Sequence, residues 1–204
     1  MTTNFLTDFI TLLVVLNPLG KLPIFLATTV GLERAVRNRV AFHAVLISFG
    51  ILIFFLVAGQ VLLQALGVGL NTFRLAGSLV LLLFALSMIF DTVQTPPPTQ
   101  PDVSPTERAV FPLAMPSIAG PGTMLTVVVL TDKDRFHWAE QGSTALALIL
   151  VLALVYLVMR FATPLVQFLR RAGISILSRV MGLILAAVAM EGMVVSVLAI
   201  LRQL

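Results

Sequence analysis

The chain has 204 residues, of which 59% are apolar and 11% are charged. A soluble domain is about 45–50% apolar and about 25% charged, so this composition excludes a soluble globular fold. The apolar runs are continuous and do not alternate, which argues against a transmembrane barrel. The net charge of +4 is typical of basic loops beside a membrane. No basic stripe or aromatic platform accompanies it, so we expect no nucleic-acid partner.

Six apolar segments, bounded by charges and helix breakers, follow one another along the chain. Each is long enough to cross a bilayer as a helix, which needs about 20 residues. Because the first nine residues include Asp8 but neither Lys nor Arg, we expect the first segment to remain in the mature protein and not to act as a signal peptide. The segments lie at about 5–31, 40–65, 72–92, 109–131, 142–162 and 177–201.

A proline-rich stretch separates the third segment from the fourth. It contains five prolines and almost no large apolar residue, so we expect an extended, solvated linker. The predicted organisation is a first three-helix unit at 1–93, a linker at 94–107 and a second three-helix unit at 108–204.

The loop charges predict the orientation in the membrane. Eight arginines fall on one side of the predicted bilayer and four basic residues on the other. The richer side should be cytoplasmic, which places the linker in the cytoplasm and both termini outside. The richer side holds Arg34, Arg37, Arg39, Arg108, Arg160, Arg170, Arg171 and Arg179.

Proline and glycine are concentrated in the first segment of each half. The first segment contains Asn17-Pro18-Leu19-Gly20, and the fourth contains Ala119-Gly120-Pro121-Gly122. Proline removes a helical hydrogen bond and clashes with the preceding turn, so these clusters should unwind the helix at membrane depth. Freed backbone groups are tolerated there only when they are buried in protein or line a polar cavity. A simple proline kink used for packing is the alternative.

The two halves also share a pattern in their last segments. Arg74-x-x-Gly77 and Arg179-x-x-Gly182 each precede an apolar run. Three spans per half would insert the second copy upside down. We therefore predict an all-α membrane protein whose six transmembrane helices form two inverted three-helix repeats, with helices 1 and 4 discontinuous. Such a pattern indicates a secondary transporter with its binding site near the midplane.

These same stretches resemble the MarC family of bacterial inner-membrane proteins. The similarity lies in Asn17-Pro-Leu-Gly-x-x-Pro-Ile-Phe25 and in Phe111-Pro-Leu-Ala-Met-Pro-Ser-Ile-Ala-Gly-Pro-Gly-Thr123, with further matches at 73–77 and 178–185. The resemblance covers essentially the whole chain. It implies a six-spanning inner-membrane protein, similar to neutral amino acid transporters that are coupled to a cation.

The predicted substrate site lies at the two breaks. Half-helices beginning at Gly20–Lys21 and Gly122–Thr123 would present positive dipole ends to a carboxylate, while freed carbonyls could accept an ammonium group or a cation. The polar side chains could instead only cap the broken backbone. The predicted substrate-binding residues are Asn17, Pro18, Gly20, Lys21, Ser117, Gly120, Pro121, Gly122 and Thr123.

Lys21 and Glu191 stand out as ionisable residues within apolar segments. A charge at mid-membrane is costly and normally has a partner and a role. Both depart from the family pattern, which often has neutral amides there. We therefore interpret them as coupling-ion residues that form an ion pair, or Lys21 as filling the place of a coupling cation and Glu191 as a proton carrier. Alternatively, Lys21 extends to the headgroups and Glu191 faces water.

The leading functional prediction is a secondary active transporter of small neutral amino acids such as glycine, alanine or serine. H⁺ or Na⁺ would drive it, and we expect no cofactor and no metal site. A non-transporting membrane scaffold or regulatory subunit is the alternative. An intramembrane enzyme is disfavoured, because no nucleophile with a base and no acid pair stands out. A homo-oligomer is compatible with the sequence.

Overall fold

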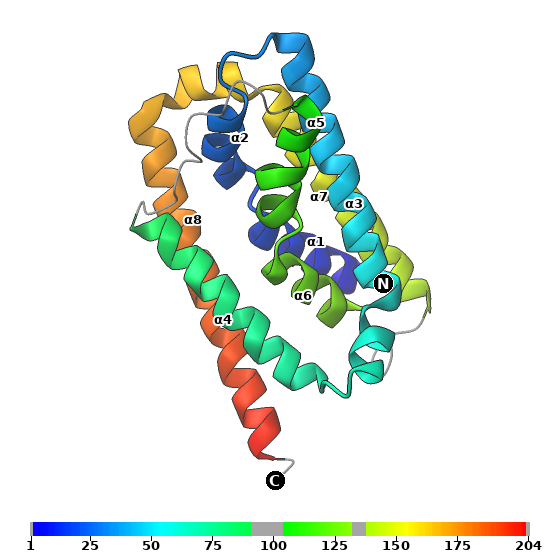
Figure 1. Ribbon diagram of the computed structural model, residues 1–204. Helices are drawn as coiled ribbons and strands as arrows, with labels where there is room; N and C mark the ends of the chain where they lie inside the picture. Colours follow the sequence, from blue (N-terminus) through cyan, green and yellow to red (C-terminus); the bar gives the residue numbers. More distant parts are fainter. Residues whose placement is uncertain (1, 91–103, 132–137, 203–204) are drawn as a thin grey trace.

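The computed structural model describes residues 2–90, 104–131 and 138–202, and these form helices without any strand. Figure 1 shows their arrangement. The elements are α1 (Thr2–Leu16), η1 (Leu19–Lys21), α2 (Leu22–Thr28), α3 (Arg34–Ala65), α4 (Leu70–Ile89), α5 (Pro105–Arg108), η2 (Ala109–Ile118), α6 (Pro121–Leu130), α7 (Trp138–Arg160) and α8 (Ala162–Leu201).

Five helical stretches of the described residues are long and apolar enough to cross a bilayer. They match five of the six predicted segments, and α6 is a shorter apolar helix within the remaining segment. The five stretches are Phe5–Thr28, Arg34–Ala65, Leu70–Ile89, Gln141–Arg160 and Ser178–Leu201.

The first predicted segment is interrupted after α1. Asn17 has a positive φ of 43°, in the left-handed region that ends a helix. One tight turn, η1, follows before the chain resumes as α2. Pro18 and Pro23 lack the N–H that a continuous helix would need, so the sequence itself enforces the interruption.

The fourth predicted segment is divided between η2 and α6. Within η2 the backbone is extended at Phe111 and Met115. Each precedes a proline, and the residue before proline is sterically biased away from helix. A further extended residue, Gly120, separates η2 from α6, which starts with Pro121 at its first position.

Two expectations about the connections were wrong. The loop predicted between the fifth and sixth segments is helical, because α8 begins at Ala162 and continues to Leu201. Pro164 falls in its first turn, where a missing N–H does no harm. The end of the predicted linker is also helical. Ser104 and Glu107 form a capping box that starts α5, whereas residues 91–103 lie outside the described part of the chain.

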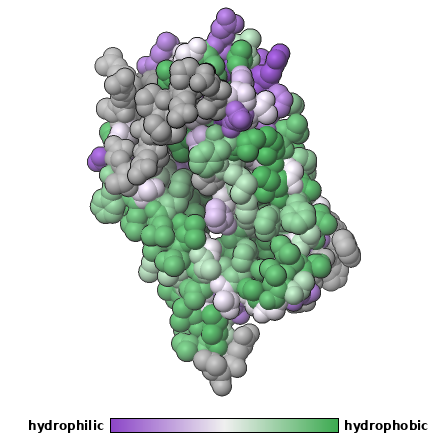
Figure 2. Space-filling view, in the orientation of Figure 1, coloured by the Kyte–Doolittle hydropathy of each residue, from purple (hydrophilic) through white to green (hydrophobic). Residues whose placement is uncertain are grey.

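The buried apolar side chains form two separate clusters. The larger joins α1, α2, α3, η2, α6 and α7, and the smaller joins α4 and α8 with Val15 of α1. Figure 1 accordingly shows α4 and α8 side by side, and α4 also packs against α6 of the bundle formed by α1, α3, α6 and α7. Figure 2 shows a broad hydrophobic surface with hydrophilic residues gathered at its upper end. An apolar belt of this kind suits a lipid environment.

Candidate functional site

The two interruptions meet inside the protein. The ammonium group of Lys21, at the end of η1, donates a hydrogen bond to the backbone carbonyl of Ser117, near the end of η2. These residues are 96 positions apart in the sequence. The contact joins the first and fourth predicted segments at the places where each loses its regular helix.

Lys21 is only 2% exposed, although it carries an ammonium group. Besides the Ser117 carbonyl, its Nζ lies 5.1 Å from the centre of the Phe84 ring, which places the cation over an aromatic face. The described residues contain no ion pair between Lys21 and Glu191, so the predicted pairing is not formed. The Lys21 side chain is buried among the helices and does not reach the surface of the protein.

Asn17 holds the first interruption in shape. Its Oδ1 accepts a hydrogen bond from the backbone N–H of Gly20 at 3.1 Å, and its Nδ2 donates to Sδ of Met88 at 3.7 Å. A Cβ on Gly20 would lie 2.4 Å from Asn17 Nδ2, so only glycine leaves room for this arrangement. Asn17 and the adjoining Pro18 are both buried. The Asn17 side chain thus links the interruption to α4, and this use matches the capping alternative.

The second interruption contains an unsatisfied polar atom. Ser117 is 6% exposed, and its Oγ has no hydrogen-bond partner among the described residues. Buried hydroxyls are normally paired, so this one is available to a partner other than the described residues. Thr123 and Gly120, a few positions along the chain from Ser117, are also buried. Gly122 lies against α4, because a Cβ added there would be 2.9 Å from the Leu81 side chain. Pro121 is exposed.

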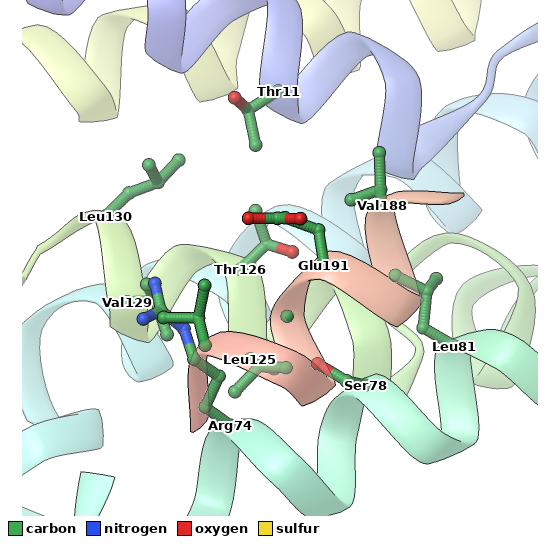
Figure 3. Close-up of a pocket in the computed structure, with 12 residues that line it drawn as sticks. Thr11, Arg74, Ser78, Leu81, Leu125, Thr126, Val129, Leu130, Val188 and Glu191 are labelled. Atoms are coloured by element: carbon green, nitrogen blue, oxygen red, sulfur yellow. The ribbon is translucent and has the colours of Figure 1, made fainter. Parts of the chain in front are cut away.

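Glu191 lies elsewhere, in a cavity of about 300 Å³ between α1, α4, α6 and α8. Figure 3 shows Glu191 of α8 and Arg74 of α4 among the residues around this space, with Thr11 of α1 and Thr126 of α6. The sequence predictions therefore divide between two places: the meeting point of the interruptions, and a separate cavity that contains Glu191.

Two further buried ionisable residues were not among the predicted site residues. Asp8 of α1 is 9% exposed, and its carboxylate accepts a hydrogen bond of 2.5 Å from the Thr144 hydroxyl of α7. Arg108 is 6% exposed and donates to the Thr28 carbonyl at 3.3 Å. Asp8 lies four residues inside the first candidate span at 5–28, so a stricter count of charges within that segment would have found it.

Comparison with known proteins gives a consistent result along the whole chain. Residues 2–201 match the family described as "MarC family integral membrane protein". A UPF0056 membrane protein of Buchnera aphidicola is 31% identical over 96% of this chain and 92% of its own length. The UPF0056 membrane protein YhcE of Escherichia coli is 32% identical, over 93% of this chain and 89% of its own.

A similar protein also occurs in an archaeon. The UPF0056 membrane protein MJ1677 of Methanocaldococcus jannaschii is 31% identical over 92% of each chain. These names state a membrane location and no substrate. No solved structure matches this chain.

Proposed function

This chain belongs to the MarC family of integral membrane proteins, and we propose that it is a secondary active transporter that binds small neutral amino acids where its two interruptions meet. The observation that carries the proposal is the contact between Lys21 and Ser117. It brings together interrupted backbone from corresponding positions of the two halves, which is where transporters built from repeats hold their substrate.

The chemistry at this point suits a carboxylate. Lys21 is a buried cation whose observed partners are a carbonyl oxygen and an aromatic ring, neither of which neutralises its charge. A buried charge is costly without a counter-charge. The free Oγ of Ser117, on the residue whose carbonyl Lys21 contacts, could donate to the same anion. An amino acid carboxylate would supply both missing interactions.

The pattern of helix packing supports an inverted repeat, with α1–α2, α3 and α4 corresponding to η2–α6, α7 and α8. Exchange of the halves converts the α1–α7 contact into the contact of α3 with η2 and α6, and both are present. It converts the α4–α8 contact into itself. Figure 1 also shows α3 and α7 running in opposite directions, as inverted copies would. On this assignment the chain would cross the membrane six times, and the first and fourth membrane-spanning segments would be the interrupted ones.

The ammonium group of Lys21 already occupies a place beside a freed carbonyl that could otherwise hold a metal cation. We therefore infer that uptake is driven by protons and does not require Na⁺. A scaffold or regulatory subunit is the competing function. A scaffold would need neither the two interruptions nor a buried lysine without an observed counter-charge at their meeting point.

The test is uptake of labelled glycine, alanine and serine by proteoliposomes, under a proton gradient and separately under a sodium gradient. Uptake driven by the proton gradient alone, above that of empty liposomes, is the expected result. Sodium-driven uptake would keep the transporter and overturn the role given to Lys21. Absence of uptake of all three by folded protein would favour the scaffold.

A further inference from the structure

One face of α4 lies along both interruptions. Residues three and four positions apart share a face of a helix, and four residues of α4 form such a row. The row consists of Gly77, Leu81, Phe84 and Met88. Its first half faces α6, since a Cβ on Gly77 would lie 2.5 Å from Leu125, and Leu81 lies against Gly122. The beginning of the row therefore packs against the helix that follows the second interruption.

The second half of the row faces the first interruption. The centre of the Phe84 ring lies 5.1 Å from Nζ of Lys21. One turn further on, Sδ of Met88 accepts a hydrogen bond from Asn17 Nδ2, and Cε of Met88 is 3.0 Å from the place of a Cβ on Gly20. The α4 helix thus contacts both interruptions with the same face.

Phe84 is the residue of this row that lies at the meeting point itself. Leu81 precedes it and contacts the second interruption, whereas Met88 follows it and contacts the first. The observed neighbours of Lys21 Nζ are the Phe84 ring and the Ser117 carbonyl. A molecule that binds to this ammonium group must therefore fit beside the ring.

Little space is left around this position. Lys21 is 2% exposed and Met88 is 4% exposed, so the surrounding side chains are closely packed. Leu81 and Met88 are in contact with glycine backbone and fill space that the fold itself needs. The Phe84 ring is half-buried and faces the functional group of Lys21. A rigid ring in a close-packed interior limits the size of what can enter beside it.

We propose that Phe84 determines substrate specificity by excluding amino acids with branched or long side chains. This inference rests on the proposed function, which places the substrate carboxylate at Lys21 Nζ and Ser117 Oγ. With the carboxylate there, the substrate side chain extends beside the Phe84 ring, where a hydrogen, methyl or hydroxymethyl group fits and a larger aliphatic group collides. Discrimination by a clash of this kind is a general route to specificity.

The experiment is competition for labelled alanine uptake into proteoliposomes under a proton gradient, with unlabelled serine, valine or leucine. In wild type, valine and leucine should need about tenfold higher concentrations than serine for the same inhibition. In Phe84→Ala the three competitors should act within about threefold of one another, and labelled leucine should be taken up. Phe84→Leu, with an apolar side chain of intermediate size, should give an intermediate preference.

The matched control is Leu83→Ala, which shortens the preceding residue of α4. Leu83 is 59% exposed and lies outside the row, so this variant should keep the preference of wild type. The ratio between two competitors does not depend on the amount of folded protein in a preparation. Phe84→Leu carries the same test where Phe84→Ala is not recovered folded.

The outcomes separate this inference from the proposed function. Uptake that is lost in Lys21→Met, with an unchanged competitor preference in the Phe84 variants, would overturn the inference and leave the proposed function standing. The inference also fails if Leu83→Ala relaxes the preference equally, or if wild type transports alanine without discriminating against leucine. Absence of uptake by folded wild type would overturn the proposed function and this inference with it.

Discussion

At the scale of single residues, Asn17 shows how one side chain can stabilise an interruption. Its left-handed backbone conformation is one that asparagine tolerates better than most residues. Its amide group contacts the Gly20 N–H and the Met88 sulfur, which ties the interruption to α4. Asn17 thus provides both the backbone conformation that ends α1 and a hydrogen-bond acceptor for one of the N–H groups freed by the interruption.

Asn17→Val should destabilise the protein by about 2–3 kcal/mol. A β-branched residue is strained at positive φ, by roughly 1–2 kcal/mol, and the half-buried Gly20 N–H would lose its acceptor. Asn17→Gly separates the two effects, since it accepts the backbone conformation and removes only the side-chain bonds. Thermal unfolding in detergent should rank wild type above Asn17→Gly and that above Asn17→Val. Equal melting temperatures for all three would contradict this account.

At the scale of helices, the sequence predicted much of the fold for identifiable reasons. Long apolar runs located the five spanning stretches, because helix length and hydropathy are local properties. The Pro and Gly clusters located the interruptions, since their steric effects are also local. The extent of α8 was missed because its first part, at 163–176, was interpreted as a loop, whereas Pro164 in a first turn is compatible with helix.

The candidate site was predictable only in part. Asn17, Lys21 and Ser117 could be named from the breaks, but their contacts join residues far apart in the sequence. The sequence could not show that Glu191 and Lys21 lie in different parts of the protein, because both were known only as charges within apolar segments. Arg74 was noted as part of the Arg74-x-x-Gly77 pattern, and only the packing of α4 against α8 and α6 places it beside a cavity.

The close packing of α4 against α8 depends on Gly182. A Cβ at this position would lie 3.0 Å from the Ala85 carbonyl oxygen, a backbone atom that cannot turn aside. Gly182→Ala should therefore lower stability by about 1–3 kcal/mol through overpacking. Gly50→Ala is the matched control on α3, where nothing lies within 4 Å. That variant should be neutral or stabilising by up to about 1 kcal/mol. Equal thermal shifts for the two would argue against close α4–α8 contact.

The start of α5 should respond to acid. The Ser104 N–H and hydroxyl hold the pKa of Glu107 below its ordinary value. A lowered pKa means that the carboxylate stabilises the folded cap at neutral pH. This contribution is lost as the pH falls below the ordinary glutamate value of about 4.3 and through the lowered one. Amide exchange at Glu107 and Arg108 should accelerate relative to α3 over that range, whereas Glu107→Gln should show no such transition.

At the scale of the whole molecule, charge is distributed unequally between its two ends. Arg37 donates to Thr163 at the start of α8, and Arg108 donates to the end of α2, so these basic residues gather at one end. Figure 2 shows hydrophilic residues concentrated at that end. From the positive-inside rule we predict that this end faces the cytoplasm and that both termini lie outside.

Because the chain has no cysteine, single introduced cysteines can test the orientation without background. Glu33→Cys, before α3, and Leu66→Cys, after it, are exposed positions at opposite ends of one helix. An impermeant maleimide added to intact cells should label Leu66→Cys and leave Glu33→Cys unlabelled until the membrane is permeabilised. The reverse pattern would invert the assigned orientation.

The central claim is that a small neutral amino acid is carried through the point where Lys21 meets Ser117. Its most direct test is the initial rate of labelled alanine uptake into proteoliposomes under a proton gradient, measured in parallel for wild type, Lys21→Met, Ser117→Ala and the exposed control Glu33→Gln. With folding verified by size exclusion and thermal unfolding, we expect Lys21→Met to lose at least tenfold, Ser117→Ala to lose several-fold and Glu33→Gln to match wild type. Equal uptake by wild type and Lys21→Met would contradict the account.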